Sequence, residues 1–215
     1  VAGLLMLFAL ATYLAGYRYL SETARGTATI EPSAPLTVQQ KRAIGALIVV
    51  MLICIPHSIA FYQNSNIGFV WINGHVDRSV AGFQIPIAWF GSAMDSFISI
   101  ACVPFLFALW RWQARHGGEP GEISKIGIGA AMAACANLVL AFAALLPGRV
   151  SPIWFTLYEV ILGVAFIWQW PTLLALTSRI APQRLKSTLM GAAFLTLFAS
   201  NMTIGRIGAL YEHMT

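Results

Sequence analysis

Two acidic side chains stand inside long apolar stretches of this sequence. Asp95 interrupts the stretch from Ser79 to Trp110, and Glu159 interrupts the stretch from Val150 to Ser178. A charge at membrane depth costs about 2.5–3.5 kcal/mol on insertion scales, so such a group usually faces a cavity, a partner or a substrate path. Asp95 and Glu159 are therefore the first candidates for binding a proton or a cation.

A histidine and an arginine stand at depths where they could pair with these carboxylates. Asp95 lies about 15 Å into its span at 1.5 Å per residue, and His57 has a comparable depth on the preceding span. An imidazole and a carboxylate there could exchange a proton or share one with a substrate amine; a structural polar pair is the alternative. Arg206 and Glu159 have similar depths near the outer face, and an outer ion pair or a structural charge remain equally open.

Three further sets of polar or aromatic side chains within the spans could bind a ligand or have a structural role. Asn137 is better explained as a residue that joins helices by a hydrogen bond. The run Trp168 to Pro171 could line a cavity or pack between helices and lipid. Gln63, Asn64 and Asn66 could belong to a pocket or to a hydrated helix end.

The composition indicates a membrane protein. The sequence is 58% hydrophobic with 10% charged residues and a mean hydropathy of +0.73, whereas a soluble domain has about a quarter charged residues. A helix needs about 20 mostly apolar residues to cross a bilayer. We predict an all-α polytopic bundle in one transmembrane domain over 1–215, with spans at about 1–17, 41–71, 85–110, 124–146, 152–178 and 186–210.

The basic residues predict the orientation of the spans. Most of them fall in every second loop, which would place them on one side of the membrane: Arg18, Arg25, Lys41, Arg42, Arg111, Arg115, Lys125, Arg179, Arg184 and Lys186. The other side would hold Arg78, Arg149 and Arg206. The positive-inside rule then predicts that the linker 18–40 and the loops 111–125 and 179–186 are cytoplasmic. Because the basic residues are scattered rather than aligned on one face, nothing indicates nucleic-acid binding.

Motifs of soluble enzymes are missing from the sequence. It has no paired-histidine metal spacing, no glycine-rich phosphate loop and no nucleophile elbow. Cys54, Cys102 and Cys135 fall within predicted spans, where buried packing is the expected role. We therefore predict no enzyme activity, no cofactor and no metal site.

Several ordered motifs resemble those of a known transporter family. The segment from Trp170 to Pro182 is similar to the Ser-Pro … Lys-Leu-Ala-Pro signature of the proton-dependent oligopeptide transporter (POT) family, a branch of the major facilitator superfamily. Similar matches cover nearly the whole chain: His75–Arg78, Gly82–Pro86, Trp89–Ser92, Leu189–Phe194 and Ser200-Asn201. The resemblance implies that the chain is a fragment with the sixth to eleventh helices, a major-facilitator-type carboxy-terminal half whose amino-terminal partner half is missing.

The sequence departs from the family at the positions that bind the peptide. Tyr62-Gln63 stands where the family usually has Glu-Gln, and Phe166 stands where a glutamate pairs with the peptide amino terminus. Ala193 replaces a tryptophan, and Asp95 is new at its position. The resemblance therefore implies a retained scaffold with a rebuilt pocket, and we expect a substrate and proton site made of Asp95, Glu159, His57, Tyr62, Gln63, Phe166, Trp170 and Asn201.

The function that the resemblance implies is secondary active transport in the inner cell membrane. We expect proton-coupled symport of di- or tripeptides or a related small solute by alternating access. The expected partners are a peptide-like small molecule, protons, the lipid bilayer and the missing half. The alternatives are a carrier of another organic solute, a transport-inactive membrane receptor or scaffold and, third, an integral-membrane enzyme.

Overall fold

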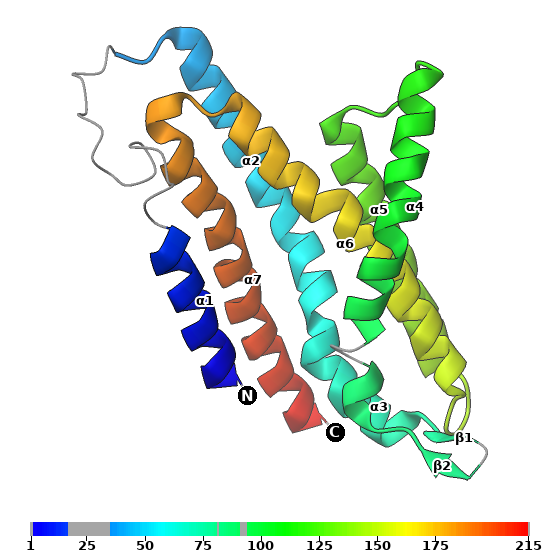
Figure 1. Cartoon of the computed structure of the whole chain (residues 1–215). Coiled ribbons are helices and arrows are strands. Elements are labelled where there is room, and N and C mark those ends of the chain that lie inside the picture. The colour runs from blue at the N-terminus through cyan, green and yellow to red at the C-terminus, as the bar shows by residue number, and fades with distance from the viewer. Residues whose placement is uncertain (1, 17–34, 81, 91–93, 215) are drawn as a thin grey trace. The chain divides into compact units, whose positions relative to one another are not determined.

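The computed structural model describes residues 2–16, 35–80, 82–90 and 94–214. By its contacts the chain divides into two compact units, Val1–Leu36 and Thr37–Thr215. That the chain is one transmembrane domain over 1–215 stays a prediction. The first unit contains helix α1 (Ala2–Gly16), and much of the predicted linker 18–40 lies outside the described residues. The second unit contains the remaining elements (Figure 1).

Helix α2 (Val38–Tyr62) opens the second unit with a capping box. The Thr37 hydroxyl accepts a hydrogen bond from the Gln40 backbone N–H at 3.2 Å, and the Gln40 side chain accepts one from the Thr37 N–H at 3.0 Å. This exchange satisfies two backbone donors at the helix start. Pro56 lies inside the helix without ending it.

The predicted span 41–71 is not a single α-helix. It changes at Gln63 to the 3-10 helix η2 (Gln63–Ser65) and continues as helix α3 (Ile67–His75). Asn66 has φ −119° and ψ −89°, outside the helical region. Asparagine and serine side chains compete with helical backbone hydrogen bonds, and the run Asn64-Ser65-Asn66 accounts for the break.

The predicted span 85–110 is displaced along the chain. A short hairpin comes first, with β1 (Ser79–Val80) antiparallel to β2 (Phe83–Gln84) and Gly82 at φ +82°. Pro86 disfavours the α conformation at the residue before it, which agrees with the extended backbone at the end of β2. Helix α4 occupies Met94–Arg115.

Helix α6 (Pro152–Ile180) is the central helix of this unit. Its start is capped by Ser151, and Pro152 occupies the first turn, where no backbone N–H is needed. Helices α4 and α5 (Glu122–Ala144) both pack against it, and so do α2 and α7 (Lys186–Met214), which follows the 3-10 helix η4 (Gln183–Leu185) (Figure 1).

Small residues allow α5 and α6 to approach closely. Ala133, Ala136 and Ala143 are almost completely buried. A Cβ atom added at Gly129 would lie 2.9 Å from the Ala165 carbonyl oxygen and 3.1 Å from the Gln169 Cβ, so only glycine fits there. Close packing through small residues is typical of membrane helices, and the alanine-rich sequence of α5 agrees with it.

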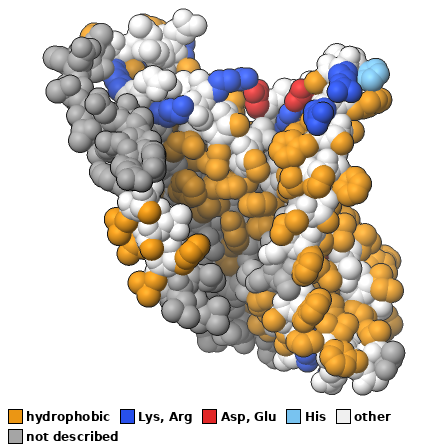
Figure 2. All heavy atoms as spheres, in the orientation of Figure 1, with side chains coloured by type: hydrophobic (Ala, Val, Ile, Leu, Met, Phe, Trp, Pro, Cys, Tyr) orange, Lys and Arg blue, Asp and Glu red, His pale blue; other side chains and the backbone are white. Residues whose placement is uncertain are grey.

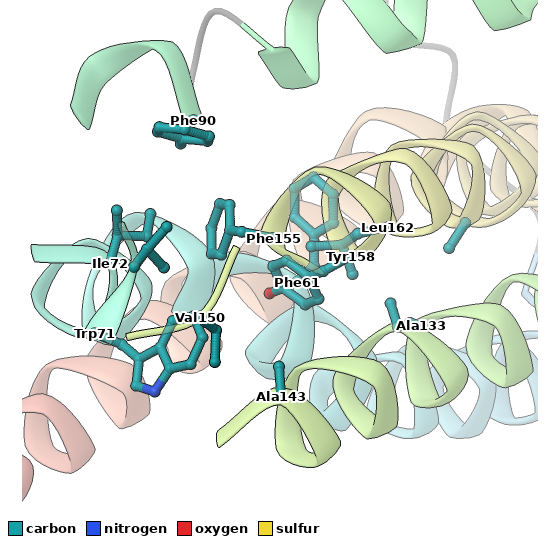
Figure 3. Packing of buried hydrophobic residues seen from close by; sticks show 13 residues of the cluster. Phe61, Trp71, Ile72, Phe90, Ala133, Ala143, Val150, Phe155, Tyr158 and Leu162 are labelled. Carbon is teal, nitrogen blue, oxygen red and sulfur yellow. The ribbon is translucent and has the colours of Figure 1, made fainter. Parts of the chain in front are cut away.

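An aromatic core fills one end of the unit. Phe155, Tyr158 and Leu162 of α6 are fully buried, and Phe90 meets Phe155 edge-on at 6.1 Å between ring centroids (Figure 3). Backbone hydrogen bonds close this end, because the Val150 N–H donates to the His75 carbonyl at 2.8 Å. A second, mainly aliphatic core joins α2, α6 and α7 towards their other ends.

Five helical segments among the described residues are long and apolar enough to cross a membrane: 38–65, 96–115, 122–144, 152–180 and 183–211. The described apolar part of α1 is shorter, at Met6–Gly16. Figure 2 shows hydrophobic side chains along the length of the bundle and charged ones gathered at one end. Phe97, Phe105 and Leu138, on helices α4 and α5, are each more than two-thirds exposed, as expected of side chains that face lipid.

Candidate functional site

Four of the predicted site residues line one narrow pocket between α2, α6 and α7. They are His57 and Tyr62 of α2 and Phe166 and Trp170 of α6, and Leu197 of α7 completes the lining. The residues on α6 are four positions apart, so they lie on the same face one turn from each other. Helical periodicity thus explains why both of these α6 side chains face the same pocket.

Aromatic rings form the wall of this pocket, which we call the aromatic wall: Phe61, Tyr62, Phe166 and Trp170. Phe61 and Phe166 are stacked with centroids 4.7 Å apart, and Phe61 meets Tyr62 edge-on at 5.0 Å. Trp170 meets Phe194 of α7 edge-on at 5.5 Å. Tyr62, Phe166 and Trp170 are only half-buried, so each presents part of its ring outside the core.

Beneath the wall lies a set of buried polar residues, which we call the polar floor: His57, Ser58 and Gln169. They are 6%, 3% and 2% exposed. The Nε2 of Gln169 and both ring nitrogens of His57 have no hydrogen-bond partner among the described residues. The sequence pointed to the Trp168–Pro171 run as a cavity lining, but it did not single out Gln169 or Ser58.

Gln63 lies in a different pocket from its neighbour Tyr62. This second pocket has a volume of about 330 Å³ and a mostly apolar lining, which includes Ile67, Trp71 and Leu140. Its polar side chains are those of Gln63, Asn64, Asn137, Tyr158 and Tyr211. Gln63 Nε2 donates a hydrogen bond to Asn137 Oδ1, and Asn137 Nδ2 donates to the Ala133 carbonyl at 2.9 Å. Asn137 therefore joins α5 to η2, which confirms its interpretation as a helix-packing residue.

Glu159 is enclosed within the bundle. We expected it in a water-filled crevice, but it is 0% exposed and lines neither pocket. The reason is its position on α6: the neighbouring Phe155, Tyr158 and Leu162 are also fully buried in the aromatic core. It lies seven residues before Phe166, two turns along about the same helix face.

The predicted ion pair between Glu159 and Arg206 does not appear among the described residues. Arg206 is exposed on α7, whereas Glu159 is enclosed. The ion pairs that the described residues form lie at the other end, between Lys125 and Glu119 at 2.6 Å and between Arg179 and Glu122 at 2.6 Å. Lys125 also lies over the Trp110 ring, 4.4 Å from its centroid.

Two other predicted site residues do not join the pocket. Asn201 is exposed, and its Nδ2 donates to the Leu197 carbonyl of its own helix at 2.8 Å, so the helix backbone satisfies it locally. Asp95 belongs to α4, but its side chain lies outside the described residues, and its expected approach to His57 stays untested. Within the described part of the chain, no three His, Cys, Asp or Glu side chains are grouped to hold a metal ion.

Comparisons with known sequences point to one family. A family model described as the POT family matches residues 18–215. The peptide transporter YePEPT of Yersinia enterocolitica is 32% identical over 154 residues, which cover 69% of this chain and 30% of that protein. The uncharacterized transporter YclF of Bacillus subtilis is 25% identical over 153 residues, covering 70% of this chain and 30% of that protein. The chain thus spans about 30% of the length of these curated relatives.

Solved structures show the same fold. A peptide transporter POT variant in complex with alafosfalin has a TM-score of 0.74 and 21% identity, covering 84% of this chain and 37% of that chain. A POT family transporter in complex with 5-aminolevulinic acid has a TM-score of 0.75 and 18% identity, covering 99% and 48%. The predicted all-α fold class, a helical bundle of the major-facilitator type, is therefore confirmed.

Proposed function

This chain belongs to the POT family, and on that basis we propose that it supplies one wall of the solute cavity of a secondary active transporter. Because it spans about 30% of its curated relatives, we propose that a longer protein carries the transport activity. In that protein a second helical half faces the wall, and the two halves alternate access to the solute.

The pocket between α2, α6 and α7 is the observation that carries this proposal. Transporters of this architecture bind their solute near the bilayer midplane. Phe166 stands midway along α6, about 21 Å from either end at 1.5 Å per residue. Half-buried rings beside buried, partnerless polar groups at that depth are typical of a ligand site, because ligand pockets combine apolar walls with a few polar groups.

The proposed solutes are di- or tripeptides or a related small molecule. One relative is named a peptide transporter, and a structural neighbour is a POT family transporter in complex with a thioalcohol-conjugated peptide. Another neighbour is in complex with 5-aminolevulinic acid, which extends the range of solutes to small molecules other than peptides.

We assign proton coupling to Glu159, with Asp95 as the second acidic candidate. Glu159 is fully enclosed on α6, two turns before Phe166 of the pocket, and carboxylates inside membrane helices commonly belong to proton paths. A rearrangement that exposes it to water would favour its ionised form. Uptake and release of a proton would then follow the same conformational change that moves the solute.

The location that agrees with this function is the inner cell membrane, which the multi-pass helices would span. The positive-inside rule places the basic linker 18–40 and the loops 111–125 and 179–186 in the cytoplasm. The ion pairs of Lys125 and Arg179 would then lie on the cytoplasmic side.

Uptake into proteoliposomes tests the proposal. The full-length protein is reconstituted, a pH gradient is imposed, and accumulation of a labelled dipeptide is measured. We expect accumulation above equilibrium that Glu159→Gln abolishes while passive counterflow exchange remains. Glu122→Gln is the matched control, because Glu122 lies at the start of α5 and pairs with Arg179.

Two results would contradict the proposal in different ways. If Glu159→Gln retains full gradient-driven accumulation, the assignment of Glu159 is wrong, and the same assay on Asp95→Asn tests the second carboxylate. If the protein binds peptides without accumulating or exchanging them, the receptor alternative is correct.

A further inference from the structure

We propose that the narrow pocket, formed by the aromatic wall and the polar floor, binds an uncharged end of the solute. This end carries a hydrogen-bond acceptor next to an apolar or aromatic group. N-acylated peptides are the simplest members of this class. This inference rests on the proposed function, because it identifies the chemistry that one wall of the solute cavity selects.

The charge of the pocket lining is the first argument. The described lining residues are aromatic, aliphatic or neutral polar, and none of them is a carboxylate, a lysine or an arginine. An ammonium group that entered would lose its water without gaining a counter-charge, which is unfavourable. His57 and Tyr62 carry no negative charge in their neutral forms, so neither offers a counter-charge to an ammonium.

An ammonium could instead bind to the faces of aromatic rings. The ring arrangement disfavours this, because Phe61 stacks on Phe166 at 4.7 Å with an interplanar angle of 24° and covers one of its faces. Trp170 is engaged edge-on by Phe194. The rings form a continuous wall against which a flat or branched apolar group packs, not an open cage around a cation.

The polar floor supplies the second argument. The Nε2 of Gln169 is a donor, and a neutral imidazole offers one donor and one acceptor. These groups are more than nine-tenths buried, line the pocket and have no partner among the described residues. Buried polar groups are generally hydrogen-bonded, so a ligand carbonyl that reaches them would satisfy donors that the folded chain leaves open.

The pocket must widen before such a ligand enters. It is closed in this structure, with no space for even a water molecule, and the half-buried rings of Tyr62, Phe166 and Trp170 form its edge. Binding therefore requires these rings to move apart so that the ligand reaches His57 and Gln169. The same rings then cover the apolar part of the bound group.

A matched pair of peptides tests the inference by binding alone. The melting temperature of the purified full-length protein is titrated with Phe-Ala and with N-acetyl-Phe-Ala, which differ in the charged amino group and the added carbonyl. We expect the acetylated peptide to have a Kd at least tenfold lower. Equal affinities, or tighter binding of Phe-Ala, would overturn the inference. Because the assay does not require transport, its failure is distinct from the failure of accumulation that would refute the proposed function.

Variants of the wall and the floor assign the preference to this pocket. Phe166→Glu places a carboxylate in the wall and should reverse the preference towards free Phe-Ala by tenfold or more, whereas Phe166→Leu should keep the wild-type order. The double variant His57→Leu with Gln169→Leu should remove the preference for the acetyl group. If Phe166→Glu does not fold, Tyr62→Glu makes the same change at the other edge of the wall. An unchanged ratio in a folded glutamate variant would overturn the inference.

Discussion

Tyr62 and Gln63 are consecutive residues that belong to two different pockets. Tyr62, the last residue of α2, borders the narrow pocket with the aromatic wall. Gln63, the first residue of η2, borders the pocket of about 330 Å³ and is hydrogen-bonded to Asn137. Consecutive residues of a helix point about 100° apart, so one stretch of chain serves both the proposed ligand site and a helix contact.

Both pockets contain buried polar atoms that have no hydrogen-bond partner among the described residues, Asn64 Oδ1 and the Tyr158 hydroxyl in the second pocket and His57 and Gln169 Nε2 in the narrow one. The pockets differ in that the second one also contains a side-chain hydrogen bond between two helices. We therefore expect substitutions in the second pocket to change mainly stability and those in the narrow pocket to change mainly ligand binding.

The largest effect should come from the helix contact that supports both pockets. Gly129→Val places side-chain atoms where even a Cβ would lie 2.9 Å from the Ala165 carbonyl, so α5 and α6 must separate. Overpacking of this kind costs about 1–3 kcal/mol, and occasionally more, and we expect a lower melting temperature in detergent. Gly127→Val is the control, because a Cβ at Gly127 meets nothing within 4 Å. Equal melting temperatures of the two variants would contradict the close contact.

The next effect should separate the functions of the two pockets. Gln169→Leu removes a donor of the polar floor that has no hydrogen-bond partner among the described residues. We expect binding of N-acetyl-Phe-Ala to weaken by about tenfold, which corresponds to about 1.4 kcal/mol, with little change in melting temperature. A large loss of stability at unchanged affinity would make Gln169 a structural residue and abolish the contrast between the pockets.

The second pocket should respond in the opposite way. Asn137→Leu removes the partner of the Gln63 side chain and the link between α5 and η2. Hydrogen bonds between membrane helices contribute about 0.6 kcal/mol on average, so we expect a small decrease in thermal stability with unchanged peptide affinity. Gln63→Leu should give a similar decrease, and the double variant should lose less than the sum of the two. Additive losses in this double-mutant cycle would contradict a direct interaction.

The sequence predicts the helical membrane fold and part of the site because both depend on local patterns. Long apolar stretches require helices in a bilayer, and the i to i+4 spacing places Phe166 and Trp170 on one face. The separation of Tyr62 from Gln63 could not be predicted in this way. It depends on which helices pack beside each side chain, α6 and α7 in the pocket of Tyr62 and α5 at Gln63.

The enclosure of Glu159 also lay beyond sequence reasoning. Whether an acidic residue of a membrane helix faces a crevice or a core depends on the partners of that helix. Here Phe90, distant in sequence, packs on Phe155 one turn before Glu159. Gln169 was named only within the run Trp168 to Pro171, because a single amide between two tryptophans has no periodic signal.

The smallest effect concerns a residue that sequence reasoning assigned to the site. Asn201 is exposed, and its side chain donates to the Leu197 carbonyl one turn earlier in α7. The helix keeps its own backbone hydrogen bonds without this contact. Asn201→Ala should therefore change the free energy of unfolding by less than about 0.5 kcal/mol, as is typical of surface substitutions. Peptide affinity should also stay the same, measured by the same titration. A tenfold loss of affinity would move Asn201 into the site, and the ligand-binding surface would then include the exposed face of α7 as well as the pocket beside Leu197.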